Sequence, residues 1–398
     1  MIQKRLAGIL LIALVIVGNS SQHLQLVKAE SFSSPLVFLM KGDLFTWSLS
    51  DSKLTQLTHY GYNYEPVISP DGKRIAYKSL AEVAIPANKV DAGNVNVYLY
   101  APQNIWVWDL ASGQSRRVAA QPSSIRHNPS SGVWQNALMR STPAWSPDSN
   151  KLAWVEATLP DNKYRLVVYD FTADASKTLT SSLPTPYDND GQPSMFNLQW
   201  AAIGLGMTAR VGRFSGEGLG DFPTVLIDAQ GKTLAAYPLS DAEFGAVWAS
   251  YGKRVQVAFL DHDFSWQLSD PLTQQQTWFD YPALELYSPT AGNSAAYTVR
   301  YTQSQSEITW TVFDNAGVGT SLPYTGSIWD GFRLTLDPTG QAVAYTADDG
   351  VYVWRNATAN KIAGTESISK DTNWIADGAM AWGIIGWRPI SASNAPTG

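Results

Sequence analysis

The chain has 398 residues, of which 44% are hydrophobic and 16% charged, a composition that supports a large core and excludes a disordered chain. Its formal net charge of −6 disfavours binding to the phosphate backbone of nucleic acids. The absence of cysteine excludes disulfides, thiolate catalysis, cysteine-ligated zinc and a lipid anchor on an N-terminal cysteine.

Residues 1–29 are predicted to be a secretory signal peptide. Lys4 and Arg5 precede an apolar run from Leu6 to Val17, and Val27-Lys28-Ala29 offers small residues at the positions that a signal peptidase reads. The run is shorter than the ~20 residues of a spanning helix, so we expect cleavage, with an uncleaved N-terminal anchor as the alternative. Cleavage removes three cations and no acid, which leaves 25 basic and 34 acidic residues, a net charge of −9. No later segment is long and apolar enough to predict a membrane span.

Three short strands are predicted next, at 36–40, 43–49 and 54–58, separated by Lys41-Gly42 and by Ser50-Asp51-Ser52. Segments of similar length recur in the same order over 342–362, near the other end of the chain. The start of the mature chain therefore resembles the last three strands of a repeat whose first strand is missing.

A β-hairpin is predicted at Pro66–Tyr77. Ile68 ends a short apolar strand, Ser-Pro-Asp-Gly supplies a turn, and Ile75-Ala76-Tyr77 begins the return strand. Two further strands are predicted at 104–110 and 115–119, which makes four strands in one unit. The unit recurs from Pro143 onward, where Ser-Pro-Asp-Ser occupies the turn, and continues with strands at 165–171 and 177–180.

Seven copies of this unit are indicated by an aromatic or aliphatic residue that ends the first strand. These residues are Ile68, Trp145, Trp200, Trp248, Tyr287, Leu336 and Trp382, at intervals of 77, 55, 48, 39, 49 and 46 residues. Four strands in about 40 to 50 residues is the size of a β-propeller blade. The strand near Trp382 would supply the first strand that the N-terminal copy lacks, and its pairing with the strand at Leu36 would remove two exposed sheet edges.

The sequence therefore predicts an all-β fold, a seven-bladed β-propeller over residues 30–390, closed by pairing of its N- and C-terminal strands and followed by a tail at 391–398. Six or eight blades also fit, because the later copies match less well.

The two sharpest copies resemble a known repeat. Ser69-Pro70-Asp71-Gly72 followed by Ile75-Ala76-Tyr77, and Trp145-Ser146-Pro147-Asp148 followed by Leu152-Ala153-Trp154, resemble the WD40-like (PD40) repeats of the TolB-type β-propeller family. The resemblance implies a propeller in a bacterial envelope protein, periplasmic or extracellular. It implies little about activity, because such repeats occur in binding proteins and beside the catalytic domains of peptidases.

The long insertions are predicted to lie on one face. In a propeller the hairpins between first and second strands, here 69–73 and 146–150, lie on one side, which we call the turn face. The joints between second and third strands and between blades lie on the opposite side, the loop face. The insertions at 80–96, 121–142, 181–194 and 212–222 all fall on the loop face.

Aromatic, basic and acidic side chains on this face suit stacking and hydrogen bonding to a peptide, a glycan or an envelope protein. The residues predicted for ligand binding are Tyr60, Tyr62, Tyr64, Arg126, His127, Trp134, Arg140, Tyr187, Arg213, Glu217, Trp329 and Trp374. The alternative for each is that it packs its loop onto the scaffold.

Calcium is the one cofactor that the sequence suggests. Asp188-Asn189-Asp190-Gly191 resembles the start of a calcium loop, with Asp188 and Asp190 as ligands, but Gln199 stands where a bidentate Glu would close the site. A common solvated turn is the alternative. His59, His127 and His262 are too far apart in sequence to predict a zinc site, and no nucleophile elbow or phosphate loop is present.

These observations favour a non-catalytic propeller that binds a ligand on its loop face over the first three full blades. The alternative is a propeller enzyme, a lyase or glycoside hydrolase, with acid and base residues at the mouth of the central channel. A purely structural envelope component is a third interpretation.

Overall fold

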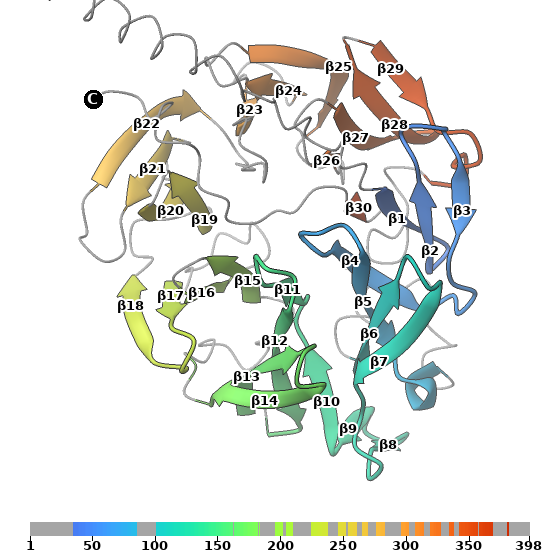
Figure 1. Ribbon diagram of the computed structural model, residues 1–398, viewed down its shortest axis with the longest axis vertical. Helices are drawn as coiled ribbons and strands as arrows, with labels where there is room; N and C mark the ends of the chain where they lie inside the picture. The colour runs from blue at the N-terminus through green and yellow to red at the C-terminus, as the bar shows by residue number, and fades with distance from the viewer. Residues whose placement is uncertain are drawn as a thin grey trace, which may run out of the picture. The chain divides into compact units, whose positions relative to one another are not determined.

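The structure is a computed structural model, and almost all of the residues it describes lie in β-strands or in turns between them (Figure 1). The described residues are 35–85, 101–161, 163–181, 183, 196–201, 204–209, 224–237, 246–251, 254–260, 265–269, 276–282, 296–301, 307–313, 319–327, 334–337, 342–356, 358–368 and 380–381. One short 3-10 helix, η1 (Glu82–Ala84), follows the fifth strand. Within the described part of the chain, no helix has the length and hydrophobicity needed to span a bilayer.

The first half of the chain forms three main sheets and one separate hairpin. Sheet A, in spatial order, comprises β3 (Leu54–Gln56), β2 (Asp43–Trp47), β1 (Leu36–Met40) and β30 (Met380–Ala381). Sheet B comprises β4 (Asn63–Ile68), β5 (Arg74–Leu80), β6 (Gln103–Asp109) and β7 (Gln114–Ala119). Hairpin C comprises β8 (Arg126–Asn128) and β9 (Val133–Gln135). Sheet D comprises β10 (Ala137–Arg140), β11 (Ala144–Trp145), β12 (Lys151–Leu159), β13 (Lys163–Asp170) and β14 (Ala175–Thr180).

Four more antiparallel sheets follow in chain order. Sheet E comprises β15 (Phe196–Ala201), β16 (Gly204–Ala209), β17 (Thr224–Ile227) and β18 (Thr233–Tyr237). Sheet F comprises β19 (Ala246–Tyr251), β20 (Arg254–Leu260), β21 (Ser265–Ser269) and β22 (Gln276–Pro282). Sheet G comprises β23 (Ala296–Tyr301), β24 (Glu307–Phe313) and β25 (Gly319–Ser327). Sheet H comprises β26 (Leu334–Leu336), β27 (Ala342–Ala347), β28 (Gly350–Arg355) and β29 (Thr358–Lys361).

The repeated turn motif makes the same hydrogen bonds in each sharp copy. Ser69 Oγ donates to Asp71 Oδ1 at 2.6 Å and accepts from the backbone N–H of Arg74 at 2.9 Å. In the next copy Ser146 Oγ donates to Asp148 Oδ1 at 2.6 Å and accepts from the next strand at 2.8 Å. These side chains satisfy backbone groups that the turn leaves unpaired. The local motif therefore specifies the hairpin.

The two ends of the described chain meet in sheet A. β1 pairs with β30 in antiparallel register, with Val37 opposite Ala381 and Phe38 opposite Met380. Trp382, the predicted end of this strand, lies outside the described residues.

The predicted similarity between the N-terminal strands and 342–362 also extends to side chains. Thr58 Oγ1 accepts from Leu44 N–H at 2.9 Å, and Thr365 Oγ1 accepts from Val351 N–H at 2.9 Å.

The core lies between consecutive sheets, because side chains along a strand alternate between its two faces. In β1, Val37 and Leu39 pack toward sheet B, whereas Leu36 and Phe38 pack toward sheet H. Further apolar clusters lie between sheets B and D and between sheets D and E. Sheets A, B and D are therefore each buried on both faces.

A tryptophan at the end of the first strand links one sheet to the one before it. Trp145 Nε1 donates to the carbonyl oxygen of Val67 at 3.2 Å, and Trp200 Nε1 donates to that of Ala144 at 3.0 Å. Val67 and Ala144 hold the same place in their own repeats, one residue before Ile68 and Trp145. The indole N–H therefore makes an equivalent contact at two successive interfaces.

The prediction of a loop over 121–142 is wrong for much of this segment, which contains β8, β9 and β10 (Figure 1). β10 continues the first strand of sheet D: Arg140 pairs with Glu156 and Ala144 with Ala153, which leaves one extra residue to bulge out between them. Ala137-Leu138-Met139 is buried, and this burial favours a strand over a solvated loop.

The repeated indole contact gives a first test. Trp145→Phe keeps an aromatic ring but removes the N–H donor, so we expect the free energy of unfolding to fall by about 1 kcal/mol in addition to the effect of the smaller ring. Urea denaturation measures this change. Trp108→Phe on β6 is the control, because that half-buried indole makes no hydrogen bond within the described structure. Equal losses in the two variants would contradict a role for the indole hydrogen bond.

Candidate functional site

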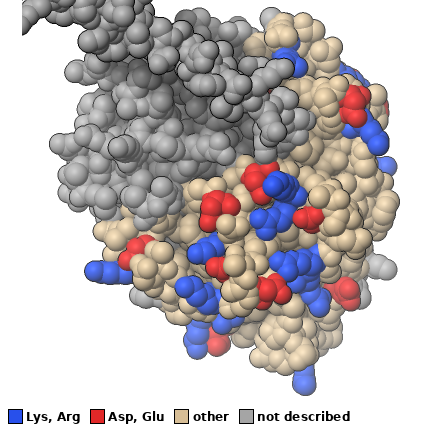
Figure 2. Space-filling view, in the orientation of Figure 1, with Lys and Arg blue, Asp and Glu red and all other residues tan. Residues whose placement is uncertain are grey.

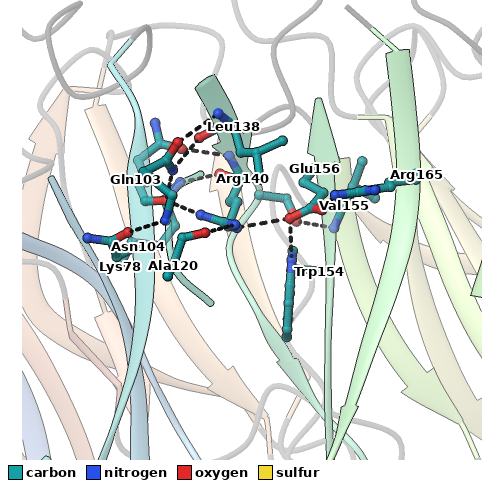
Figure 3. A network of polar contacts seen from close by, with 12 residues as sticks. Lys78, Gln103, Asn104, Ala120, Leu138, Arg140, Trp154, Val155, Glu156 and Arg165 are labelled. Atoms are coloured by element: carbon teal, nitrogen blue, oxygen red, sulfur yellow. Dashed lines mark hydrogen bonds and ion pairs between the residues drawn. The ribbon is translucent and has the colours of Figure 1, made fainter. Parts of the chain in front are cut away.

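Among the described residues, buried charges concentrate between sheets B and D, in the network that Figure 3 shows. The network lies at the end of this interface that faces away from the Ser69–Lys73 and Ser146–Asn150 turns. The turns precede β5 and β12, so residues late in these two strands lie toward the loop face. β10 and the beginnings of β6 and β13 reach the same end, because they pair with the late parts of β12 and β5. The charged side chains here come from β4, β5, β10, β12 and β13, while β6 contributes the amides of Gln103 and Asn104.

Glu156 on β12 is the centre of this network. Its Oε2 accepts from Arg140 Nε at 3.0 Å and from Trp154 Nε1 at 3.1 Å, while its Oε1 accepts from Arg165 Nε at 2.6 Å. Arg165 Nη2 also lies 2.5 Å from Oε1. Burial by itself would raise the pKa of the Glu156 carboxyl, but the two guanidinium groups outweigh burial and hold this pKa below its usual value. Glu156 therefore remains a carboxylate.

Arg140 on β10 connects Glu156 to sheet B. Its side chain is 3% exposed, and it donates to the carbonyl oxygens of Gln103 and, at 2.8 Å, Ala120, as Figure 3 shows. Burial lowers the pKa of the Arg140 guanidinium, and the carboxylate of Glu156 offsets part of that shift. This guanidinium donates to backbone carbonyl groups of Gln103 and Ala120 on one side and to the carboxylate of Glu156 on the other. Arg140 therefore links the two sheets.

A second buried ion pair lies beside this one. Lys78 Nζ on β5 is 2.9 Å from Glu65 Oε2 and donates to the carbonyl oxygen of Arg140 at 2.8 Å. Thr142 Oγ1 donates to the same oxygen of Glu65. Glu65 sits at a bulge in β4 with φ +50°, a conformation that is uncommon for a residue with a side chain. Lys78 and Thr142 together hold the partly exposed carboxylate of Glu65 in place.

Amide side chains satisfy the backbone around the network. Gln121 donates from Nε2 to the carbonyl oxygens of Gln103 at 2.6 Å and Leu138 at 2.8 Å, and its Oε1 accepts from Leu138 N–H. Asn104 Oδ1 accepts from Gln121 N–H at 3.1 Å. The interface is thus polar at the loop face and apolar toward the turn face, where Trp145, Trp154 and their neighbours pack.

Two of the predicted tyrosines are half-buried where the chain passes from sheet A to sheet B. The Tyr60 hydroxyl donates to the carbonyl oxygen of Leu80 at 3.0 Å, and its ring meets that of Tyr62 edge to face at 5.7 Å. Burial raises the pKa of Tyr60 to about 12, so its hydroxyl stays protonated. The third tyrosine, Tyr64, is buried, with Lys78 Nζ 5.0 Å from its ring, and cannot contact a ligand at the surface.

Hairpin C carries three more of the predicted residues. Arg126 is exposed, and the half-buried ring of His127 lies 4.5 Å from that of Trp134. Trp134 itself is 6% exposed and belongs to the apolar cluster that also includes Tyr64 and η1 residue Ala84. Trp134 and Arg140 were both predicted to meet a ligand directly. Their burial shows that they support the surrounding structure instead.

The remaining predicted residues lie outside the described part of the chain. They are Tyr187, Asp188, Asp190, Arg213, Glu217, Trp329 and Trp374. Among the described residues, no three His, Asp or Glu side chains come close enough to hold a metal ion. Figure 2 shows basic and acidic residues interspersed on the described part of one face, without a large patch of one sign.

The sequence did not single out Glu65, Lys78, Glu156 or Arg165 as site residues. A signal was present for two of them, because Lys78 and Glu156 each interrupt an otherwise apolar strand interior. A charge in such a position predicts a buried ion pair, but its partner is fixed only by pairing between distant strands.

Comparison with known proteins gives the fold. No protein-family model and no curated protein sequence matches the chain. Among solved structures, an oligogalacturonate lyase from Vibrio parahaemolyticus is 13% identical, with 80% of this chain and 86% of that chain covered and a TM-score of 0.53. The β-propeller domain of the trilobed protease from Pyrococcus furiosus is 13% identical over 82% of this chain and 88% of that domain, with a TM-score of 0.47.

TolB from Acinetobacter baumannii is 12% identical over 72% of this chain, with a TM-score of 0.42. The chain spans 63% of that TolB chain and 45% of a matched acylaminoacyl peptidase. Together with the succession of antiparallel sheets that pack face to face, the likeness to the lyase structure shows that the fold is a β-propeller.

The buried network predicts a large effect for Glu156→Gln. The neutral amide leaves the buried guanidinium of Arg140 without a counter-charge, so we expect the free energy of unfolding to fall by about 3 kcal/mol or more. Urea denaturation at pH 7 measures the loss. Glu82→Gln, the same substitution at an exposed acid on η1, is the matched control and should change stability by less than about 0.5 kcal/mol. Similar losses in both variants would contradict the central role of Glu156.

The same carboxylate predicts a pH dependence. Because the pKa of Glu156 is lower in the folded protein than the ordinary value of 4.5, its stabilising contribution is complete above that value. It is lost as the pH falls through the folded-state pKa. The difference in unfolding free energy between wild type and Glu156→Gln should therefore be constant from pH 7 to about pH 5 and shrink on further acidification. A difference that grows as the pH falls would contradict the lowered pKa.

Proposed function

We propose that this protein is an exported seven-bladed β-propeller that binds a peptide, a glycan or an envelope protein on its loop face, without catalysis. The pairing of β1 with β30 supports closure of the ring by the two chain ends, and the contact of β26 with β30 brings sheet H next to sheet A. The basic and apolar character of residues 1–29 supports export to the periplasm or the cell surface of a bacterium.

The observation that carries the binding proposal is the surface next to the buried network. Exposed Arg126 and the half-buried rings of Tyr60, Tyr62 and His127 lie in the connections that enter sheets B and D. Half-buried aromatic rings are typical of recognition sites, because they lose little side-chain entropy when a ligand binds, and an exposed guanidinium adds a charged donor. The buried Trp134 and Arg140 support the structure around them.

The state of the buried carboxylates favours binding over acid–base catalysis. A glycosidase or lyase needs a carboxyl group that can give or take a proton near neutral pH. Glu156 is held ionised by two guanidinium groups, and Glu65 is paired with Lys78. Glu156 is therefore not arranged to exchange a proton with a substrate near neutral pH.

A screen followed by substitution tests the proposal. The purified mature chain is applied to an immobilised peptide library and a glycan array, and the affinity of any probe that binds is measured by calorimetry. We expect Tyr62→Ala and Arg126→Ala each to weaken binding about tenfold, because they remove a stacking surface and a charged donor. The melting temperature checks that the variants fold.

Lys177→Ala is the matched control, since it removes an exposed cation on β14, the outer strand of sheet D, and should leave affinity unchanged. A probe whose affinity is unaffected by both loop-face substitutions would move the binding site elsewhere. Turnover of a probe by the wild-type protein would replace the binding proposal with an enzymatic one.

A further inference from the structure

The charges between sheets B and D do not balance. Lys78, Arg140 and Arg165 contribute three positive charges, and Glu65 and Glu156 contribute two negative ones. Charges removed from water need partners, because each unpaired ion carries a desolvation cost of several kcal/mol. Among the described residues of this network, one cation therefore exceeds the number of carboxylates.

The excess charge reaches solvent at Arg165 on β13. Its side chain is 40% exposed, whereas those of Arg140 and Glu156 are almost completely buried. Nε and Nη2 of Arg165 are directed at Glu156 Oε1, and within the described structure its Nη1 amino group has no partner. The guanidinium is thus fixed on one side and has unused N–H donors on the other.

A second cation stands on the same face of the same strand. Lys163 lies two residues before Arg165, so both side chains leave β13 on the side that faces sheet B. Lys163 is 80% exposed and is 3.5 Å from Asp161, an exposed pair that contributes little. The ammonium group is therefore available to a ligand.

We infer that the loop-face end of the interface between sheets B and D binds the carboxylate group of an acidic ligand, with Arg165 and Lys163 as its anion-binding residues. This inference rests on the proposed binding function and gives the chemical class of its ligand. A carboxylate accepts paired hydrogen bonds from the free side of a guanidinium, and its charge balances the excess cation. Glu156, itself fixed by Arg140 and Trp154, orients Arg165 for this contact.

Carboxylates occur in acidic peptides and in uronate-containing glycans, and the experiment separates these two sources. Calorimetry measures binding of hexaglutamate and of a uronate hexasaccharide to the mature chain, each beside its neutral counterpart, hexaglutamine or a neutral hexasaccharide. We expect one acidic probe to bind, its neutral counterpart to bind at least about tenfold more weakly, and the affinity to fall between 50 and 300 mM salt, as expected for exposed charges.

The variants locate the contact. Arg165→Gln should weaken binding of the acidic probe by about tenfold or more, and Lys163→Gln by about threefold, while Lys177→Gln on β14 should have no effect. Arg165→Lys keeps the charge that Glu156 needs but loses the fork, so it should fold like wild type and bind with intermediate affinity. If Arg165→Gln unfolds, as its melting temperature would show, Arg165→Lys and Lys163→Gln decide the question.

Two results would overturn the inference. One is equal affinity for acidic and neutral probes, or no affinity for either acidic probe. The other is an acidic probe whose affinity does not change in Arg165→Lys and Lys163→Gln. In either case, a neutral probe that loses affinity in Tyr62→Ala would show that the proposed binding face stands although this inference fails.

Discussion

The inner edges of the sheets impose the constraint on which the rest of this structure depends. β4 and the β10–β11 strand each stand at the edge of a sheet, so part of their backbone has no strand partner. At two successive interfaces an indole N–H from the next sheet meets such a backbone carbonyl group, at Val67 and at Ala144. The same ring fills space between the sheets. One residue at one repeat position therefore both sets the spacing between two sheets and donates a hydrogen bond to an unpaired backbone carbonyl group at a sheet edge.

This constraint explains why the interface between sheets B and D has two chemically distinct ends. Toward the turn face, rings and aliphatic side chains bury area and need no partners. Toward the loop face the same interface holds ions, which on general grounds stabilise no more than well-packed apolar residues would. A polar network at the loop face fits the proposed recognition role, because Arg140 and Glu156 fix neighbouring side chains in orientations that an apolar core would not specify.

The parts of the fold that follow from short-range chemistry were predictable from the sequence. The Ser-Pro-Asp turns were, because serine and aspartate bond to backbone groups only a few residues away. The strands predicted at 36–40 and 104–110 correspond to β1 and, shifted by one residue, to β6, because short apolar runs bounded by turn residues favour strands. The burial of Trp134 and Arg140 was not predictable, since it depends on β10 extending an inner strand across a bulge. The partners of Glu156 were not predictable either, because Arg140 is 16 residues away in sequence and meets Glu156 only through strand pairing.

The network also shows how a site arises within a repeat. Asn63 at the start of β4 and Arg140 in β10 stand 77 residues apart, the spacing of the two sharpest repeats. Each donates to a carbonyl oxygen at the beginning of the third strand of the preceding sheet, at Gly42 just before β2 and at Gln103, the first residue of β6. Asparagine is satisfied there. Arginine is longer and has donors left over, so it reaches across to Glu156 and joins two sheets. The repeat thus places a hydrogen-bond donor at this position. Arginine in place of asparagine adds the charge on which the proposed ligand recognition at this interface would depend.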